Sequence, residues 1–303
     1  MSVLDGPRLE KRLIKLQDTV VWATALNSDT LQLEDGTEIQ TEEVVHLAPC
    51  QPTKIICPHL TYQSRGIESR NKPQPTLEPT YFMKPITALN HHKGEIFKPE
   101  DCRYLNYEGE FATIVGKEAR DITPEEAWDH IAGFAPALDM GIHDFRDTDS
   151  GSMLRVKGSD GMCPIGPGIV SGVDPREQTL RTYRNGKLVQ EASIGEELIW
   201  GPDYMIADLA RHITLMPGDI VLTGTPCHSR SLDVGDTIEV EVTGMGKLCC
   251  TVANRPGPRA RVGHQPTNSD EVRRVALGND ERVPEHFKDN YRDASRSLQE
   301  KQQ

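Results

Sequence analysis

Short apolar segments rich in β-branched residues recur along the chain and are separated by polar, turn-forming residues. Such segments predict β-strands, and we expect strands at 111–115, 169–170, 180–183, 220–223, 238–242 and 248–252. The segment 123–126, Thr-Pro-Glu-Glu, has the N-cap, proline and acidic first turn of a helix start and predicts a helix to about Phe134. Residues 202–213 place apolar side chains on one face and predict a second helix. This pattern indicates an α+β fold that is mainly β.

The pattern also divides the chain. Residues 1–50 alternate apolar and polar positions around turns such as Asp35-Gly36, which predicts a small N-terminal β module. Residues 51–80 contain five prolines and few apolar runs, so we expect a linker or lid. Residues 81–255 hold the strands of the main domain, and the polar segment 256–303 is expected to be a tail that is loosely attached or packs on a partner.

Charge and composition exclude several classes of protein. With 46 acidic and 34 basic side chains the formal net charge is -12, which disfavours binding to nucleic acid. No apolar run approaches the ~18–20 residues that cross a bilayer, and the first residues lack the basic-then-apolar order of a secretory signal. The seven cysteines form no Cys-x-x-Cys pair and are expected to be free thiols. We therefore expect a cytoplasmic protein that binds neither nucleic acid nor membranes.

Three carboxylates have settings that suggest a metal site. Glu108 and Glu110 lie two residues apart at the start of a strand, so both side chains point to the same face. Asp139 lies within an apolar, strand-like run, where an isolated carboxylate is costly unless it is paired or metal-bound. Oxygen ligands of this kind suit Mg²⁺, Ca²⁺ or Mn²⁺. The alternative for the Glu-x-Glu pair is a solvated outer face of the sheet.

Two further segments have weaker signals. Arg155 and Lys157 share a face if their segment is extended, and Lys157 would then neutralise substrate charge beside the ion; alternatively it is a solvated lysine. A strand ends at Thr223-Gly224-Thr225, where backbone amides such as that of Gly224, together with the Thr225 hydroxyl, are suited to hold a carboxylate. Many turns of this composition are only turns.

Residues 81–253 resemble the fumarylacetoacetate hydrolase superfamily. The resemblance is carried, in order, by Phe82-Met-Lys84-Pro85, Tyr107-Glu-Gly-Glu110, Val115-Gly-Lys117, Leu138-Asp139-Met140, Lys157-Gly158, Cys163-Pro-Ile-Gly-Pro167, Asn185-Gly186, Pro217-Gly-Asp219 and Thr223-Gly-Thr-Pro226. It implies a mixed β-sandwich roll, a homodimer, and one Mg²⁺ or Mn²⁺ ion per chain. The ligands that it implies are Glu108, Glu110 and Asp139. Lys157 and Thr225 match positions that contact the 2-oxo-carboxylate end of the substrate.

The segments 152–158 and 229–230 are similar to those of decarboxylase and isomerase members from aromatic meta-cleavage pathways. This likeness implies a small anionic 2-oxo or 2-hydroxy-dienoic di- or tricarboxylate substrate, transformed by decarboxylation or isomerisation through a metal-stabilised enolate. Two alternatives stay open. One is hydrolysis of a C–C bond in an acylpyruvate or β-diketo acid, and the other is a non-catalytic metal-binding relative.

The chain departs from the family pattern at the lid. Where many members have a His-x-x-Glu dyad, this chain has Arg65 and Glu68. Arginine stays protonated and cannot be a general base near neutrality, which favours decarboxylation over hydrolysis and leaves Glu68 as a group that could move a proton; His59 lies outside the register of the dyad. The residues expected to line the pocket are Arg65, His143, Arg146 and Arg155. They would bind an extra substrate carboxylate, unless some of them are surface charges.

Overall fold

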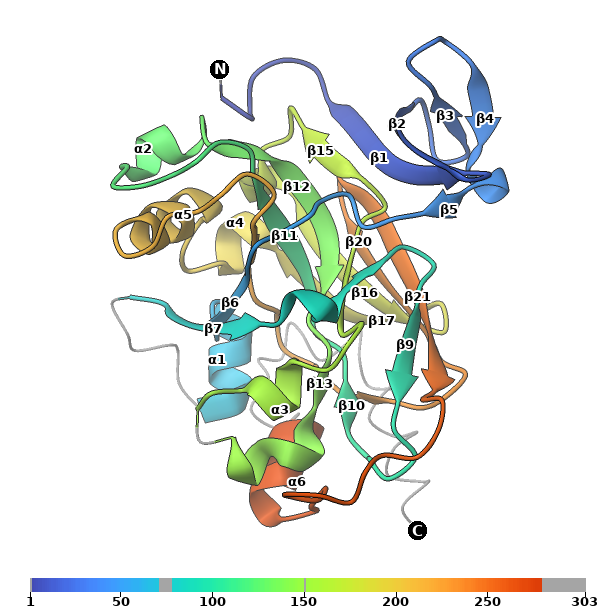
Figure 1. Ribbon diagram of the computed structural model, residues 1–303. Helices are drawn as coiled ribbons and strands as arrows, with labels where there is room; N and C mark the ends of the chain where they lie inside the picture. Colours follow the sequence, from blue (N-terminus) through green and yellow to red (C-terminus); the bar gives the residue numbers. More distant parts are fainter. Residues whose placement is uncertain (1, 71–77, 150, 280–303) are drawn as a thin grey trace.

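The computed structural model describes residues 2–70, 78–149 and 151–279, and Figure 1 shows the arrangement of their elements. Strands predominate over helices and form a 13-stranded, a 5-stranded and a 3-stranded sheet within the described residues. The α+β, mainly β prediction is therefore confirmed, as is each of the six strands expected from the apolar segments. No helix in the described ranges is both long enough and apolar enough to traverse a bilayer.

The first 50 residues form short antiparallel strands at one end of the molecule (Figure 1). The elements are β1 (Leu9–Leu16), β2 (Thr19–Ala25), β3 (Thr30–Gln32), β4 (Glu38–Gln40), the 3₁₀ turn η1 (Thr41–Glu43) and β5 (Val45–His46). They enclose a small core of their own around Ile14, Ala23 and Leu31. Strand β1 also pairs with β15 of the main domain, so the module extends the large sheet.

The large sheet contains the strands that position the predicted site residues. Its other strands are β6 (Ile55–His59), β7 (Thr80–Lys84), β8 (Leu89–His91), β11 (Gly109–Val115), β12 (Ile131–Leu138), β14 (Cys163–Ile165), β15 (Ile169–Ser171) and β18 (Ile220–Leu222). Every residue of β11 is buried. Strands β11 and β12 are antiparallel with Gly109 opposite Leu138, so the start of one strand lies beside the end of the other.

A second sheet packs against the first to make the sandwich. It comprises β17 (Lys187–Ser193), β16 (Thr179–Arg184), β20 (Thr237–Val242), β21 (Gly246–Asn254) and β9 (Glu95–Lys98), while β13 (Gly141–Ile142), β10 (Leu105–Asn106) and β19 (Ser231–Leu232) form the small third sheet. Phe111 and Phe134 from the large sheet share one buried core with Leu180, Ile238 and Leu248 from the second. Burial of this apolar area is the main favourable term in folding.

The helices are short and lie around the sheets. They are α1 (Gln63–Arg70), α2 (Pro124–Ala127), α3 (Leu154–Lys157), α4 (Ile194–Glu197), α5 (Pro202–Ala210) and α6 (Asp270–Leu277), with 3₁₀ turns η2 (Ile86–Ala88), η3 (His143–Thr148) and η4 (Pro175–Glu177). Thr123 caps α2 as expected, but the predicted extension of that helix to Phe134 is wrong. The apolar residues 131–138 form β12 instead, because pairing with β11 overrides the local helix signal.

Two segments differ from their expected character. Strand β6 and helix α1 occupy much of 51–80, where the proline content predicts a linker or lid; β6 is a largely buried strand that pairs with β18, and the lid role stays a prediction. The described part of the polar tail, 256–279, packs on its own chain rather than hanging loosely. Val272 and Ala276 of α6 are fully buried against Tyr104. Residues 280–303 lie outside the described part of the chain. Helices α1, α3 and α6 gather at one end of the sandwich (Figure 1).

Candidate active site

The three predicted carboxylates meet at one point. Glu108, Glu110 and Asp139 each offer an oxygen atom, and these atoms all lie within 4.8 Å of one another. The antiparallel register explains the meeting, because Glu110 sits opposite Ala137 and Asp139 follows directly after β12. The amide of Asp139 donates to the carbonyl oxygen of Glu108 at 3.0 Å and ties the two segments together.

Burial makes this cluster electrostatically strained. Glu110 is 2% exposed, and burial followed by the neighbouring Asp139 and Glu108 raises its pKa well above the ordinary value. Burial also acts to raise the pKa of Glu108, but Lys157 and Arg65 outweigh it and lower that pKa. Three carboxylates in a dry site repel one another unless a cation or a shared proton intervenes.

A hard divalent cation fits these donors. The three residues supply only oxygen atoms, which Mg²⁺ and Mn²⁺ prefer. Two lysines already flank the cluster: Lys157 Nζ lies 2.6 Å from Glu108 Oε2 and 2.9 Å from Asp139 Oδ2, while Lys84 Nζ contacts Asp139 Oδ1. This set holds three carboxylates and two lysines, so one negative charge is left uncompensated when all three carboxylates are ionised. Glu108, Glu110 and Asp139 are thus the residues that would hold such an ion.

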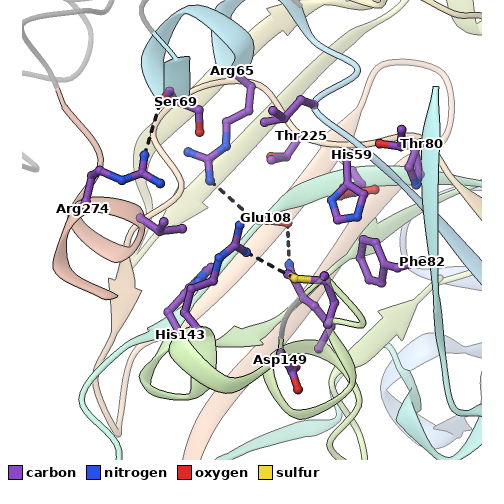
Figure 2. Close-up of a pocket in the computed structure, with 18 of the residues that line it drawn as sticks. His59, Arg65, Ser69, Thr80, Phe82, Glu108, His143, Asp149, Thr225 and Arg274 are labelled. Carbon is purple, nitrogen blue, oxygen red and sulfur yellow. Dashed lines mark hydrogen bonds and ion pairs between the residues drawn. The ribbon is translucent and has the colours of Figure 1, made fainter. Parts of the chain in front are cut away.

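Glu108 and Glu110 of this cluster line a cavity of about 410 Å³. That volume suits a small-molecule substrate. Figure 2 shows Glu108 near the centre of the site, with Arg65, Arg274, His143 and His59 around it. The ionisable residues that line the cavity are His59, Arg65, Glu108, Glu110, His143, Arg146, Asp147, Asp149, Lys157 and Arg274.

Lys157 is held as a cation in this wall. It is 3% exposed, and it lies at the end of α3. Burial acts to lower its pKa, but the adjacent Asp139 and Glu108 outweigh burial and raise the pKa above the ordinary value. Lys157 therefore supplies a fixed positive charge beside the carboxylates, and its role toward a substrate stays a prediction.

Two histidines in the cavity wall are held neutral. Burial, with further contributions from Lys157 and Arg146, lowers the pKa of His59 and brings the pKa of His143 well below the usual value. His143 is 1% exposed, and neither of its ring nitrogens has a hydrogen-bond partner within the described residues. A buried imidazole without partners is costly, and a polar substrate group would satisfy it.

Arg65 lines the cavity, whereas Glu68 does not line it and is not suited to the proton transfer expected of it. Arg65 Nη2 lies 3.5 Å from Glu108 Oε1, and its Nη1 donates to Glu68 Oε2 at 2.6 Å. Glu68 also pairs with Arg230 at 2.7 Å and is 1% exposed. Burial acts to raise its pKa, but Arg230 and Arg65 outweigh this and hold the pKa at about 2. A carboxylate so weakly basic and so enclosed is not a proton carrier; it positions Arg65.

Among the predicted arginines, Arg146 lines the cavity and Arg155 does not. Arg146 has no carboxylate partner within the described residues, and its Nη1 contacts the Met153 sulfur at 3.3 Å. The side chain of Arg155 is 56% exposed and pairs with Asp149 at 3.3 Å. The segment 154–157 is helical rather than extended, so Arg155 and Lys157 do not share a face. Arg155 is therefore a surface charge and not a pocket residue, which is the alternative that the sequence leaves open for these arginines.

In the Thr-Gly-Thr turn, Thr225 lines the cavity and Gly224 holds a carboxylate of the cluster in place. Thr225 lines the cavity, and its hydroxyl accepts a hydrogen bond from Gln190 Nε2 at 3.0 Å. The Gly224 amide donates to Glu110 Oε2 at 2.7 Å. That amide is occupied by a protein carboxylate, so Gly224 positions Glu110 instead of holding the substrate as expected. Its φ of +85° and the closeness of Thr61 at this point exclude a larger residue.

Sequence reasoning missed three functional candidates. Lys84 was part of a family motif but had no assigned role, although it contacts Asp139. His59 lies outside the sequence register of the family's His-x-x-Glu dyad and has no predicted role, yet it lines the cavity. Arg274 comes from α6 in the supposed tail, and its Nη1 donates to the carbonyl oxygen of Ser69 in α1 at 3.4 Å. Of the three, only Lys84 had a usable signal, as a lysine at the end of an apolar strand.

A protein-family model matches most of the chain. The family model described as fumarylacetoacetate (FAA) hydrolase C-terminal matches residues 54–253, about two thirds of the chain. The chain belongs to this family. The match begins before β6, so the family region includes β6 and α1, and it ends before α6.

Family relatives include enzymes of aromatic catabolism. The chain is 38% identical over 178 residues to the 4-hydroxyphenylacetate degradation bifunctional isomerase/decarboxylase of Salmonella dublin, covering 57% of this chain and 41% of the relative. It is 34% identical over 217 residues to the homoprotocatechuate catabolism bifunctional isomerase/decarboxylase of Escherichia coli, covering 71% and 50%. The chain thus spans half or less of the length of these two relatives.

A solved structure supports the fold over a wider region. The 2-hydroxyhepta-2,4-diene-1,7-dioate isomerase from Mycobacterium marinum superimposes with a TM-score of 0.74 at 28% identity, covering 82% of this chain and 100% of the isomerase. The chain described here therefore has the fumarylacetoacetate hydrolase fold, as its sequence motifs imply.

Proposed function

We propose that this chain is a Mg²⁺- or Mn²⁺-dependent enzyme that decarboxylates or isomerises a small 2-oxo or 2-hydroxy-dienoic di- or tricarboxylate. One observation carries the proposal: three clustered carboxylates suited to a divalent ion lie beside a cavity that Glu108 and Glu110 line together with arginine and histidine side chains. The named activities of the isomerase/decarboxylase relatives support the reaction class.

The two sides of the cavity have different tasks in this proposal. A divalent ion held by Glu108, Glu110 and Asp139 would act as a Lewis acid toward the 2-oxo-carboxylate end of the substrate. Lys157, fixed beside Glu108 and Asp139, stabilises negative charge that develops on the 2-oxo oxygen. Because its pKa is raised, the Lys157 side chain keeps its own positive charge throughout the reaction.

The arginine side binds the far end of the substrate. Arg146 lines the cavity without a carboxylate partner in the described chain. Arg274 of α6 also lines the cavity, but its guanidinium already pairs with Glu271 through two hydrogen bonds. A guanidinium binds a carboxylate through paired, charge-assisted hydrogen bonds. Together with the unsatisfied His143 ring, these groups favour a substrate with a second carboxylate over a monoacid.

The test is product analysis with a panel of substrates. The purified protein is stripped with a chelator, reloaded with Mg²⁺ or Mn²⁺, and incubated with 2-oxo and 2-hydroxy-dienoic mono-, di- and tricarboxylates. Release of CO₂ or a shift of the dienoate absorbance, dependent on the metal and on a second carboxylate, supports the proposal. Full turnover in excess chelator contradicts it.

Hydrolysis of an acylpyruvate or β-diketo acid is the second candidate. The observation that favours it is the presence of two neutral imidazoles, His59 and His143, in the cavity wall. Either ring is capable of activating a water molecule. The same assay separates the reactions, since hydrolysis yields a pair of acids without CO₂. Binding of Mn²⁺ and oxalate without any turnover would instead indicate a non-catalytic relative.

A further inference from the structure

His59 occupies a distinctive position in the cavity wall. It is the last residue of β6, opposite Thr80 of β7, and both residues line the cavity. The Phe82 ring packs against the imidazole with centroids 4.8 Å apart. Figure 2 shows His59 and Phe82 on the side of Glu108 away from Arg274. We propose that His59 is the catalytic acid–base that moves the substrate proton, an inference that rests on the proposed function.

The imidazole is available for this task. Within the described residues neither ring nitrogen of His59 has a hydrogen-bond partner, while packing on Phe82 restrains the ring. The next residue, Leu60, has a φ of +52°, a left-handed conformation that is unfavourable for a non-glycine residue. Such local strain is concentrated at functional sites. Here it turns the chain sharply after β6 and leaves His59 facing the cavity.

The charged groups around His59 favour its basic form. Burial first, then Lys157 of α3 and Arg146 of η3, lower its pKa, whereas Glu108 and Asp139 oppose them. A neutral imidazole accepts a proton directly. Once protonated, it is an acid that returns the proton readily, because the nearby cations disfavour the imidazolium.

The other ionisable groups are less suited to the task. Arg65 stays charged, and the Glu68 carboxylate is enclosed between Arg65 and Arg230. Lys157 is held protonated by its carboxylate partners. His143 is almost fully buried, and its pKa lies well below the ordinary value, which makes it the weaker base of the two histidines.

The source of the proton differs between the two reactions: the substrate supplies it in isomerisation, and solvent supplies it in decarboxylation. The imidazole takes a proton from the carbon next to the 2-oxo group, and the electrons of that C–H bond form the C=C bond of an enolate while the carbonyl π electrons move to oxygen. In isomerisation the imidazolium returns the proton to a carbon further along the conjugated chain. In decarboxylation the electrons of the breaking C–C bond form the enolate as CO₂ leaves, and His59, which first takes up a proton from solvent, delivers that proton to the enolate carbon.

Proton exchange tests the inference directly. The wild-type protein and His59→Gln, loaded with Mg²⁺, are incubated with pyruvate in D₂O, and loss of the C3 proton signal is followed by NMR. Turnover of the substrate identified by the panel is measured in parallel. We expect exchange and kcat to fall at least ~100-fold, the lower range for removal of an acid–base. KM and Mn²⁺ affinity should stay within about threefold, and added imidazole should restore part of the lost rate.

Matched variants keep the test decisive. His212→Gln removes an exposed histidine far from the cavity lining and should behave as the wild type. His59→Asn checks that the loss does not depend on one replacement, and rescue by imidazole separates a chemical role from misfolding. Wild-type rates in both His59 variants overturn the inference alone. An unrescued loss together with lost Mn²⁺ binding assigns His59 a structural role and also overturns it. A wild-type protein without exchange or turnover overturns the proposed function and this inference together.

Discussion

The amide of Asp139 donates to the carbonyl oxygen of Glu108 at 3.0 Å, which joins two segments far apart in the sequence. This contact continues the ladder between β11 and β12 beyond their ends. Because the strands are antiparallel, the bond places the Asp139 carboxylate beside the Glu-x-Glu pair. The carboxylate cluster thus lies at the adjoining ends of two largely buried strands, and rigid elements hold site residues more accurately than loops do.

Asp139→Asn is predicted to remove metal binding and turnover together. The amide keeps the size of the side chain but supplies one neutral oxygen in place of a charged ligand. We expect Mn²⁺ affinity, measured by calorimetry, to fall more than ~100-fold, beyond the roughly 10–100-fold range typical of supporting residues. Asp129→Asn, which lies outside the carboxylate cluster and the cavity lining, is the control. Unchanged affinity in Asp139→Asn would remove this residue from the ligand set.

Glu68→Gln is predicted to destabilise the fold strongly. Glu68 lies between Arg65 and Arg230, so its neutralisation leaves two buried guanidinium groups without their shared anion. Breaking a buried charge pair typically costs about 3–5 kcal/mol of unfolding free energy. Urea denaturation measures this loss. A variant with native stability but greatly reduced kcat would instead indicate that Glu68 moves a proton.

Arg146→Ala is predicted to impair recognition of the second carboxylate. Loss of a charge-assisted pair costs about 1.5–3 kcal/mol, so KM for a dicarboxylate should rise about 10- to 100-fold, while oxalate affinity stays nearly unchanged. Arg155→Ala is a close control, because that exposed side chain lies outside the cavity lining. Equal effects of the two substitutions would show that Arg146 has no specific role in substrate binding.

Glu197 is predicted to make stability depend on pH. Its carboxyl accepts hydrogen bonds from Ser64 in α1, but burial dominates and raises its pKa from 4.5 to about 7. The neutral form is favoured in the folded state, so this contribution is fully present below pH 4.5 and is lost as the pH rises through about 7. The loss is at most about 3 kcal/mol, at ~1.4 kcal/mol per pKa unit.

Glu197→Gln should remove this dependence. Relative to the wild type, the variant should gain unfolding free energy between pH 4.5 and pH 8, as measured by urea denaturation at several pH values. Glu196→Gln changes the exposed neighbour and should show little of the effect. A constant difference between Glu197→Gln and the wild type across this range would refute the assignment.

The sequence by itself determined the fold class, the family and the carboxylate cluster. These features have local signals: apolar β-branched segments mark the strands, and carboxylates at the ends of such strands mark the candidate metal site. The same locality explains the error at 128–134, where a helix start is readable from the sequence but the pairing of 131–138 with β11 is not.

Only the tertiary structure decided which charged groups face the cavity. Arg155 and Lys157 lie two residues apart, yet one is exposed and the other buried, because their segment is helical. Arg274 reaches the site from α6 because Val272 and Ala276 bury that helix against Tyr104. The pKa values of Glu68 and His59 likewise depend on burial and on neighbours distant in sequence. Long-range packing sets both orientation and local charge, and no local pattern in the sequence encodes either one.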